Sequence, residues 1–363
     1  MPRPVDAAPP GAGFLHTFLP GRVVFGAGTL DQVAAEVEAL GVRRALVVAT
    51  NSARAAADVV EARLGDLFAG RIDGVAQHVP TEVADHARTT ARETDADAVI
   101  AIGGGSAIGL AKAIALTAGG AVVVAVPTTY AGSEMTPVWG ETTAGRKSTG
   151  TDLRVLPRVV VYDPVLSRGL PLKVTAASVA NAIAHCVEAV WTPKADPITE
   201  LTAVEGLRAL STGLRDVLLA PDDLDARSNL LYGACLAGSA LATAGTGLHH
   251  KLCHLLGGTY NLPHAETHAA VLPQVTRVNA PAVPQAAARL AAALGTEEPS
   301  GLAAQLFDLY QAAGVATSLR DLGLTEAQVA EAAAAFKPTD NPVPVTEDLV
   351  REILTRAWSG TRP

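Results

Sequence analysis

Histidines are spread unevenly along this 363-residue chain, and five of the nine fall between residues 249 and 268. His250 and His254 are four residues apart in a segment with the apolar periodicity of a helix, so both imidazoles lie on one face. Such a pair can offer two nitrogen ligands to a divalent metal. It can equally line a pocket as a set of proton donors and anion contacts. The spacing alone is compatible with both kinds of site.

A second segment, residues 176–191, has the same arrangement of polar side chains on one helical face. Asn181, His185 and Glu188 occupy positions i, i+4 and i+7 there. An isolated histidine is usually solvated or satisfied by its surroundings. The density of imidazoles on these two segments, together with His264 and His268, therefore predicts a functional site.

A glycine-rich turn indicates a second kind of chemistry, the binding of phosphate. Gly103 ends a buried apolar run and Ser106 opens an amphipathic stretch. Glycines let the backbone approach an anion, a helix N-terminus supplies free N–H groups, and Ser106 is expected to cap that helix. Such turns also occur as plain connections, but hydroxyl groups follow the next apolar run. We therefore predict a dinucleotide cradle, without the GxGxxG fingerprint, made by Gly104, Gly105, Ser106, Thr128, Thr129 and Ser133.

Asn51 follows the first apolar run, where the adenosine ribose of a dinucleotide would lie. An acidic residue there would bind the ribose hydroxyls and repel a 2′-phosphate, and asparagine does neither strongly. The residue predicts tolerance of both NADH and NADPH, or it simply caps the following helix.

These residues must be positioned by strands and helices that alternate in the first half of the chain. Strands are predicted over 44–50, 96–104, 121–129 and 158–164, and helices over 52–69 and 106–118. Non-alternating apolar strands separated by helices are typical of a parallel sheet covered on both faces. Such a sheet binds ligands at the carboxyl ends of its strands.

The second half of the chain has almost no β-branched runs and is predicted to be all-helical, ending in a helix that Thr346 caps and that runs to Trp358. We predict an α/β dinucleotide-binding domain with a Rossmann-like parallel sheet over residues 1–166. An all-α domain follows over residues 167–363, with the active site in the cleft between the two domains. Residues 14–25 are expected to add an edge strand at a subunit interface.

Composition limits the classes of function. The 28 Lys and Arg against 36 Asp and Glu leave a net charge of −8, which argues against a nucleic-acid partner. Three widely spaced cysteines suit a reduced cytoplasmic protein. The apolar stretch 98–126 is long enough to cross a bilayer, but Lys112 and its glycines indicate a strand, a turn and a helix. We therefore expect no membrane partner, and a short flexible leader in place of a signal peptide.

Taken in order, the motifs of this chain resemble the iron-containing alcohol dehydrogenase family. They are GGGSxxxxxK (103–112), PTTxxGSE (127–134), DPxL (163–166), ASxxNAxxHxxE (177–188), and HxxxH at 250 and 254 with PH ending at 264. The resemblance implies the dehydroquinate synthase-like fold of that family. That fold has an α/β dinucleotide domain, a helical domain and a cleft between them.

Two departures from the family pattern are informative. The family's metal ligands, one Asp and three His, correspond here to Asn181, His185, His250 and His264. The first ligand has become a neutral amide, which binds Fe²⁺ or Zn²⁺ poorly, so the resemblance implies a vestigial set and no metal. An Asp usual in the glycine-turn helix is Gly109 here.

Both departures, with the segment 127–140, resemble the maleylacetate reductase branch of the family. Its members use NADH or NADPH to reduce the carbon–carbon double bond of 2-maleylacetate, giving 3-oxoadipate in the breakdown of aromatic rings such as hydroxyquinol and resorcinol. The resemblance implies an oxidoreductase acting on a CH–CH group of a small dianionic substrate, and a homodimer.

In such a reaction, hydride adds to the alkene carbon β to the ketone, and the developing enolate needs hydrogen-bond donors and an acid. The resemblance implies that the pocket is lined by His185, His250, His254 and His264, with His254 as the proton donor and Asn181 as a hydrogen-bond donor. His249 and His268 are expected to be peripheral.

Other side chains are expected near the substrate or the cofactor. Tyr130 follows the nucleotide hydroxyls and is expected to reach the substrate, unless it simply packs. Lys147 is expected at the nicotinamide ribose or, like Arg146 and Lys251, at a substrate carboxylate. Lys112 is expected to approach the cofactor.

Three other functions stay open at this stage. One is a metal-dependent alcohol or polyol dehydrogenase of the same family. Another is a lyase of the dehydroquinate synthase type, which needs an acidic zinc ligand that is not evident at position 181. The third is a binding protein without catalysis, against which the density of histidines argues.

Overall fold

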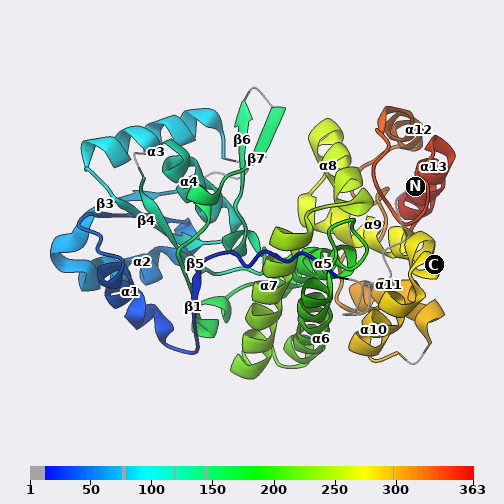
Figure 1. Cartoon of the computed structure of the whole chain (residues 1–363), viewed down its shortest axis with the longest axis horizontal. Helices are drawn as coiled ribbons and strands as arrows, with labels where there is room; N and C mark the ends of the chain where they lie inside the picture. The colour runs from blue at the N-terminus through cyan, green and yellow to red at the C-terminus, as the bar shows by residue number, and fades with distance from the viewer. Residues whose placement is uncertain (1–12, 76–78, 118–119, 144–145, 297) are drawn as a thin grey trace. The chain divides into compact units, whose positions relative to one another are not determined.

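The computed structural model describes residues 13–75, 79–117, 120–143, 146–296 and 298–363. Within these residues the chain forms two compact units (Figure 1). The α/β unit comprises Leu19–Leu170 and Asp222–Leu231, and the helical unit comprises Pro171–Pro221, Tyr232–Pro363 and the described residues before Leu19. The main division, between Leu170 and Pro171, is close to the predicted one at residue 166. The sequence did not predict that the residues before Leu19 belong to the helical unit, or that Asp222–Leu231 belongs to the α/β unit.

Six parallel strands form the main sheet of the α/β unit, in the order β1-β8-β5-β4-β2-β3. The four apolar runs predicted as strands form β2, β4, β5 and β8, and every residue of β2 and β4 is buried. The six strands are β1 (Arg22–Phe25), β2 (Ala45–Ala49), β3 (Phe68–Asp73), β4 (Ala98–Gly103), β5 (Val122–Pro127) and β8 (Val159–Tyr162).

Helices cover both faces of this sheet, as non-alternating strands require. On one face, α1 (Val33–Ala39) and α2 (Arg54–Leu64) bury an Ala, Val, Leu and Ile core against the strands. On the other face lie α3 (Thr81–Glu93) and α4 (Gly105–Thr117) (Figure 1). Short 3-10 turns connect these elements at Thr29–Gln32, Asn51–Ala53, Gly65–Leu67, Ser133–Met135, Leu153–Val155 and Pro164–Ser167.

The prediction of one helix over 52–69 was wrong at its end. The helix α2 stops at Leu64 because Gly65 adopts a positive φ of 52°. The 3-10 turn Gly65–Leu67 follows and leads into β3. This strand lies at the edge of the sheet and is only partly buried, so its sequence, FAGRID, lacks the continuous apolar run of the central strands.

A polar antiparallel hairpin of β6 (Val138–Thr143) and β7 (Arg146–Thr151) was also not predicted. Trp139 lies over Gly150, where a Cβ atom would fall 2.6 Å from the indole carbon Cζ2. The hairpin therefore needs a glycine at position 150.

The all-helical prediction for the second half is confirmed. Thr346 caps the last helix, as predicted, because its hydroxyl accepts a 3.2 Å hydrogen bond from the backbone N–H of Leu349. Short 3-10 turns occur at Ala280–Ala282 and Pro299–Gly301. The helices are α5 (Leu172–Ala189), α6 (Pro197–Leu219), α7 (Leu224–Ala244), α8 (Leu248–Tyr260), α9 (His264–Asn279), α10 (Pro284–Leu294), α11 (Leu302–Ala312), α12 (Glu326–Ala335) and α13 (Glu347–Ser359).

Packing in the helical unit brings the histidine-bearing helices together. Helix α5 packs against α6 and α9, and α8 packs against α9. A second apolar core forms where α8 and α9 meet α12 and α13. The side chains of α5, α8 and α9 can therefore meet, although they are far apart in the sequence.

In the described part of the chain, no single helix is long and apolar enough to cross a membrane. The bent pair α7 and α8 meets the criteria of length and composition when the two helices are taken together.

Candidate active site

Six imidazoles of the helical unit form one continuous cluster of rings, which we call the histidine cluster. His185 stacks on His250 with ring centroids 5.0 Å apart, and His254 stacks on His264 at 6.0 Å. The rings of His250 and His254 lie 6.2 Å apart and join these two stacks. The structure thus brings together the four histidines that the sequence predicted for the pocket. The remaining members are His249 and His268.

The histidine cluster runs from the surface into the interior. His254 and His264 are exposed, whereas His185 and His250 are buried. On the buried side, four polar atoms have no hydrogen-bond partner among the described residues: Asn181 Oδ1, His185 Nδ1, His250 Nε2 and His268 Nε2. Buried polar atoms are normally paired. A group of unpaired ones is therefore ready to bind a polar ligand.

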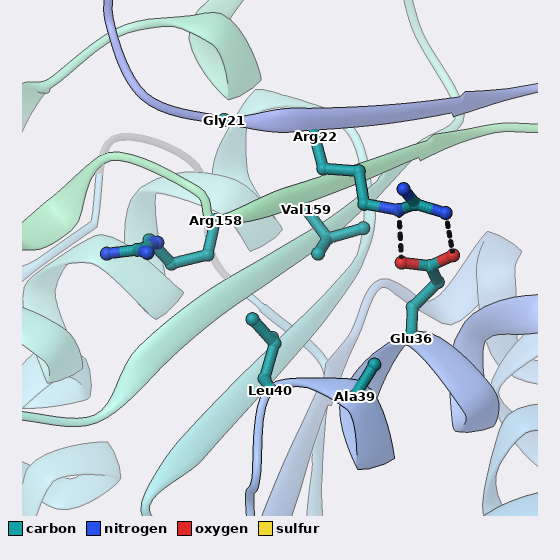
Figure 2. A pocket seen from close by; sticks show the side chains of 7 residues that line it. All are labelled: Gly21, Arg22, Glu36, Ala39, Leu40, Arg158 and Val159. Carbon is teal, nitrogen blue, oxygen red and sulfur yellow. Dashed lines mark hydrogen bonds and ion pairs between the residues drawn. The ribbon is translucent and has the colours of Figure 1, made fainter.

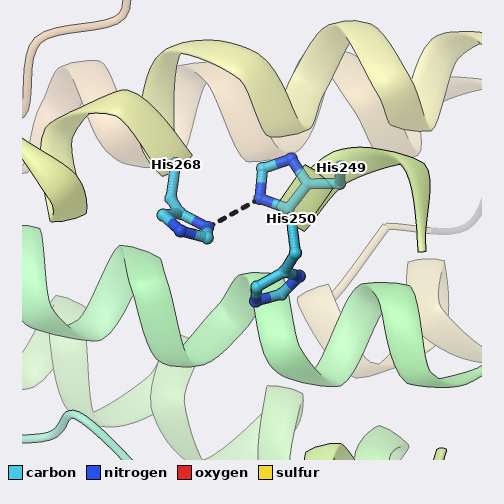
Figure 3. Close-up of side chains that lie close together, drawn as sticks. All are labelled: His249, His250 and His268. Atoms are coloured by element: carbon cyan, nitrogen blue, oxygen red, sulfur yellow. Dashed lines mark hydrogen bonds between the residues drawn. The ribbon is translucent and has the colours of Figure 1, made fainter. Parts of the chain in front are cut away.

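His249 and His268 are not peripheral, contrary to the expectation from the sequence. Both are fully buried, and His249 Nε2 lies 2.8 Å from His268 Nδ1 (Figure 3). The ring of His268 also contacts the rings of His250 and His264, at centroid distances of 4.7 and 4.6 Å. Burial lowers the pKa of His249 to about 3 and that of His268 well below its ordinary value. Both rings are therefore neutral, and the N–H group of one ring donates a hydrogen bond to the bare nitrogen of the other.

Glu188 is the carboxylate of this region, and the sequence assigned it no role. Its Oε1 accepts a 2.6 Å hydrogen bond from the backbone N–H of His249, and its Oε2 accepts one of 2.8 Å from that of Gly247. His250 Nδ1 lies 2.6 Å from the same Oε2. Burial alone would raise the pKa of Glu188, but the charge of His250 and its hydrogen bond, with those of the backbone, lower it to about 2.

At the family's ligand positions, three histidines are retained and the carboxylate is replaced by an amide. Asn181 contributes a neutral amide, and the oxygens of the nearby Glu188 already accept three hydrogen bonds. Within the described residues, His250 also has a ligand atom within 4.8 Å of those of His249 and His268, which stand outside the family's ligand positions (Figure 3). Two of these rings are already hydrogen-bonded to each other.

The glycine turn of the α/β unit is tightly built. A Cβ atom on Gly103, whose φ is 149°, would lie 2.7 Å from Thr50 Cγ2, and one on Gly104 would lie 3.0 Å from Thr129 Cγ2. The ends of β2, β4 and β5 therefore meet here, as predicted for the cradle. Ser106 does not cap the helix as expected, because α4 already begins at Gly105 and places Ser106 in its first turn.

The presence of glycine at position 109, in place of the family's aspartate, also has a structural reason. A Cβ atom at this position would lie 2.9 Å from Val79 Cγ2. The side chain of Val79 fills the space that an aspartate would need.

Lys112 holds the loop that carries Ser133 and does not approach the cofactor as expected. Its fully buried Nζ donates to the carbonyl oxygens of Ser133, Thr136 and Val138 at 2.6, 2.7 and 2.9 Å. Burial lowers the pKa of Lys112 to about 7. The neighbouring Glu134 is also fully buried, accepts a 2.9 Å hydrogen bond from the hydroxyl of Tyr162, and has its pKa raised by burial.

Tyr130 is fully buried, which corrects the expectation that its phenol reaches the substrate. Its oxygen accepts a 3.1 Å hydrogen bond from Arg227 Nη1. Arg227 is itself buried and donates to the carbonyl oxygen of Leu170 at 3.2 Å. Tyr130 therefore packs in the interior, which was the alternative expectation from the sequence. No sequence pattern indicated Arg227 as its partner.

Asn51 is exposed at the carboxyl end of β2 and is not a helix cap, because Thr50 holds the N-cap position of the 3-10 turn. Arg54 Nη2 donates to Asn51 Oδ1 at 3.4 Å. Arg54, which the sequence did not single out, thus adds a cation next to the predicted ribose position.

Of the basic candidates for anion contacts, Lys251 is exposed and donates to the hydroxyl of Thr339. Arg146 and Lys147 belong to β7 by their backbones, but their side chains lie outside the described residues.

Pockets in the two units lie at other places than the cradle and the histidine cluster. One is lined by the first residues of β1 and β8 and by α1, with Arg22 and Glu36 paired across it at 2.7 Å (Figure 2). It lies at the amino ends of the strands, the edge of the sheet opposite the cradle. The other, in the helical unit, is lined by residues that include Ala177, one helical turn before Asn181, and Pro263, which precedes His264.

Comparisons with known proteins agree with the fold of each unit. The family model for iron-containing alcohol dehydrogenase matches residues 20–164, and that for the C-terminal region of the Fe-containing alcohol dehydrogenase family matches residues 175–358. Maleylacetate reductase 1 of Rhodococcus opacus is 46% identical over 96% of this chain and 98% of its own length. Maleylacetate reductase 2 of Cupriavidus pinatubonensis is 47% identical with the same coverage. The crystal structure of maleylacetate reductase from Agrobacterium tumefaciens superposes with a TM-score of 0.92 at 42% identity, covering 97% of this chain and 99% of that one.

Proposed function

Because the chain belongs to the iron-containing alcohol dehydrogenase family, we propose that it reduces the carbon–carbon double bond of 2-maleylacetate to 3-oxoadipate. The observation that carries this proposal is the neutral Asn181 beside the histidine cluster, in a chain 46–47% identical to maleylacetate reductases. The chain is then an NAD(P)H-dependent oxidoreductase of aromatic-ring breakdown. Because that cofactor pool is intracellular, we place the reaction in the cytoplasm.

The chemistry of the substrate suits imidazoles and amides. Maleylacetate is a dianionic enone, and hydride from the nicotinamide C4 adds to the alkene carbon β to the ketone. Charge then develops on the ketone oxygen, and the α-carbon takes a proton. The exposed His254 and His264 are assigned to proton transfer and substrate contact, with His254 as the donor. The unpaired atoms of Asn181, His185 and His250 are assigned to the polar groups of the substrate.

The cofactor is assigned to the α/β unit. Gly104, Gly105 and Ser106 would hold the pyrophosphate, Thr128, Thr129 and Ser133 would add hydroxyl groups, and Lys147 would contact the nicotinamide ribose. Asn51 is neutral and Arg54 is cationic, so neither repels a 2′-phosphate. We expect NADH and NADPH both to serve. Steady-state kinetics with each cofactor test this expectation, and a thousandfold preference for either one contradicts it.

The decisive experiment measures NADH oxidation by the purified enzyme with maleylacetate and with simple alcohols or polyols. We expect turnover with maleylacetate only. We also expect it to survive exhaustive chelation, because the residues at the family's metal positions lack a charged ligand.

The alternative is a metal-dependent alcohol or polyol dehydrogenase, which family membership favours. Loss of activity on EDTA treatment, restored by Fe²⁺ or Zn²⁺, would establish metal dependence. Turnover of alcohols in place of maleylacetate would establish the dehydrogenase.

We also propose a homodimer. The edge strand β1 pairs with β8 on one side, and its residues Val23 and Phe25 are exposed. A second copy of the chain would cover this edge. Light scattering coupled to size-exclusion chromatography measures the mass, and a monomer of 37.0 kDa would contradict the proposal.

A further inference from the structure

Glu188 accepts hydrogen bonds both from backbone N–H groups and from a ring of the histidine cluster. It lies on α5, is 1% exposed, and accepts hydrogen bonds from two backbone N–H groups at the start of α8. A carboxylate at a helix N-terminus is favourable because the free N–H groups and the helix dipole both stabilise it. Glu188 thereby ties the start of α8 to α5.

The third contact of Glu188 reaches into the histidine cluster. An ionised carboxylate only accepts hydrogen bonds, so the 2.6 Å contact with His250 requires the proton on Nδ1 of that ring. The other ring nitrogen, Nε2, is buried and has no partner in the described part of the protein. Nε2 is therefore the atom through which His250 can meet a ligand.

Gly247 makes this approach of Glu188 possible. A Cβ atom on Gly247 would lie 3.1 Å from Glu188 Oε1 and 3.3 Å from its Cδ, closer than ordinary contacts allow. The φ of Gly247 is −119°, so the glycine provides space and not an unusual backbone angle.

We propose that Glu188 is a positioning residue: it holds His250 in the tautomer with the proton on Nδ1 and directs Nε2 toward the substrate. The position of the ring is an inference from contacts within the helical unit alone. Its consequence for turnover rests on the proposed function.

The first test is spectroscopic and needs no substrate. Nitrogen-15 spectra of the full-length protein with labelled histidines report which ring nitrogen carries the proton, and the His250→Asn variant assigns the His250 signals. We expect the Nδ1–H form in the wild-type protein and its loss in Glu188→Gln. An amide adds an N–H₂ group that cannot accept the bonds made by the carboxylate.

The second test is kinetic. Glu188→Gln is expected to lower kcat for maleylacetate about 10²-fold, in the range for losing an orienting partner or a general acid. The KM for NADH is expected to stay within about twofold. If Glu188 had only a structural role, Glu188→Gln would lower the melting temperature, and kcat would not fall selectively while the KM for NADH stays constant.

Glu200→Gln is the matched control. Glu200 is also a buried acid of the helical unit, but it lies on α6 and pairs with Arg289. This variant should keep both the His250 spectrum and kcat. If Glu188→Gln fails to fold, Gly247→Ala replaces it, because its Cβ displaces the carboxylate without removing the charge. We expect the same changes from Gly247→Ala, about tenfold in kcat.

An unchanged His250 spectrum in Glu188→Gln, or a changed spectrum with unchanged kcat, would overturn the proposal. A wild-type protein that shows the Glu188-dependent tautomer but does not turn over maleylacetate would support the assignment of Glu188. That same result would refute the proposed function, so the two failures are distinguishable.

Discussion

Lys112 in the α/β unit and Glu188 in the helical unit are both buried side chains whose partners are mainly backbone groups, and they differ in what they hold. In the α/β unit, Lys112 donates to three carbonyl oxygens of one loop, with the hydroxyls of Ser133 and Thr136 as its further contacts. In the helical unit, Glu188 accepts from two backbone N–H groups and from an imidazole. Lys112 thus shapes the loop that carries Ser133, whereas Glu188 connects the fold directly to a ring of the histidine cluster.

The two groups also differ in how burial affects their charge. Burial lowers the pKa of Lys112 to about 7, because few of the contacts around its ammonium group are charged. Glu188 overcomes the same burial through His250 and the helix N-terminus, and its pKa falls to about 2. The helical unit therefore keeps a firmly ionised carboxylate beside the histidine cluster, and the α/β unit keeps an ammonium group close to losing its proton.

The largest expected effect comes from the exposed end of the histidine cluster. His254→Ala should lower kcat by about 10²–10⁴, the range for losing a general acid, and leave the KM for NADH nearly unchanged. Steady-state kinetics with maleylacetate measure both quantities. Near-normal turnover would remove His254 from the mechanism and move the chemistry away from this end of the cluster.

Removing the ammonium group of the α/β unit should mainly cost stability and cofactor binding. Lys112→Met leaves three buried carbonyl oxygens without their donor, so the free energy of unfolding should fall by about 3 kcal/mol or more. Denaturant titration and the KM for NADH measure the two effects. If stability and KM both stay unchanged, the loop does not depend on Lys112.

Lys112 and Glu188 should affect the stability of the protein in different ranges of pH. For Lys112 the pKa is about 7 when folded and 10.5 ordinarily, so the unfolded chain binds more protons between these values and stability rises with pH there. For Glu188 the values are about 2 and 4.5, so its contribution is lost as pH falls through that window. Melting temperatures across pH should lose the alkaline rise in Lys112→Met and part of the acid fall in Glu188→Gln. The same profile in both variants would contradict the comparison.

The smallest expected effect concerns the glycine turn. Gly104→Ala places a Cβ 3.0 Å from Thr129, so the turn must shift by a few tenths of an ångström. We expect the KM for NADH to rise about tenfold, which corresponds to about 1.4 kcal/mol, with kcat little changed. Gly169→Ala is the control, because a Cβ there meets nothing within 4 Å. Equal effects of the two substitutions would show that the turn tolerates a side chain.

Local patterns in the sequence predicted most of the fold. The continuous apolar runs became β2, β4, β5 and β8, because buried parallel strands need apolar residues on both faces. The edge strand β3 and the hairpin of β6 and β7 were not predicted, because partly exposed strands carry polar residues that also occur in helices and loops.

The sequence predicted some residues of the candidate site correctly and others wrongly. The spacing of His250 and His254, and that of Asn181 and His185, placed each pair on one helical face, and the structure brings both helices into one cluster. The expectation for His249 failed because whether it faces solvent or the core depends on the helix that packs over it. That helix, α9, supplies the partner ring, His268.

By itself, the sequence determined the elements, the glycine turn and the types of side chain available for chemistry, because these follow from interactions between near neighbours in the chain. Tertiary structure alone decided that Glu188 meets His250, 62 residues away, that Arg227 meets Tyr130, and that Lys112 points into a loop. Burial, tautomer and pKa depend on groups from distant segments that surround an atom. Only packing of the helices and strands brings those groups together.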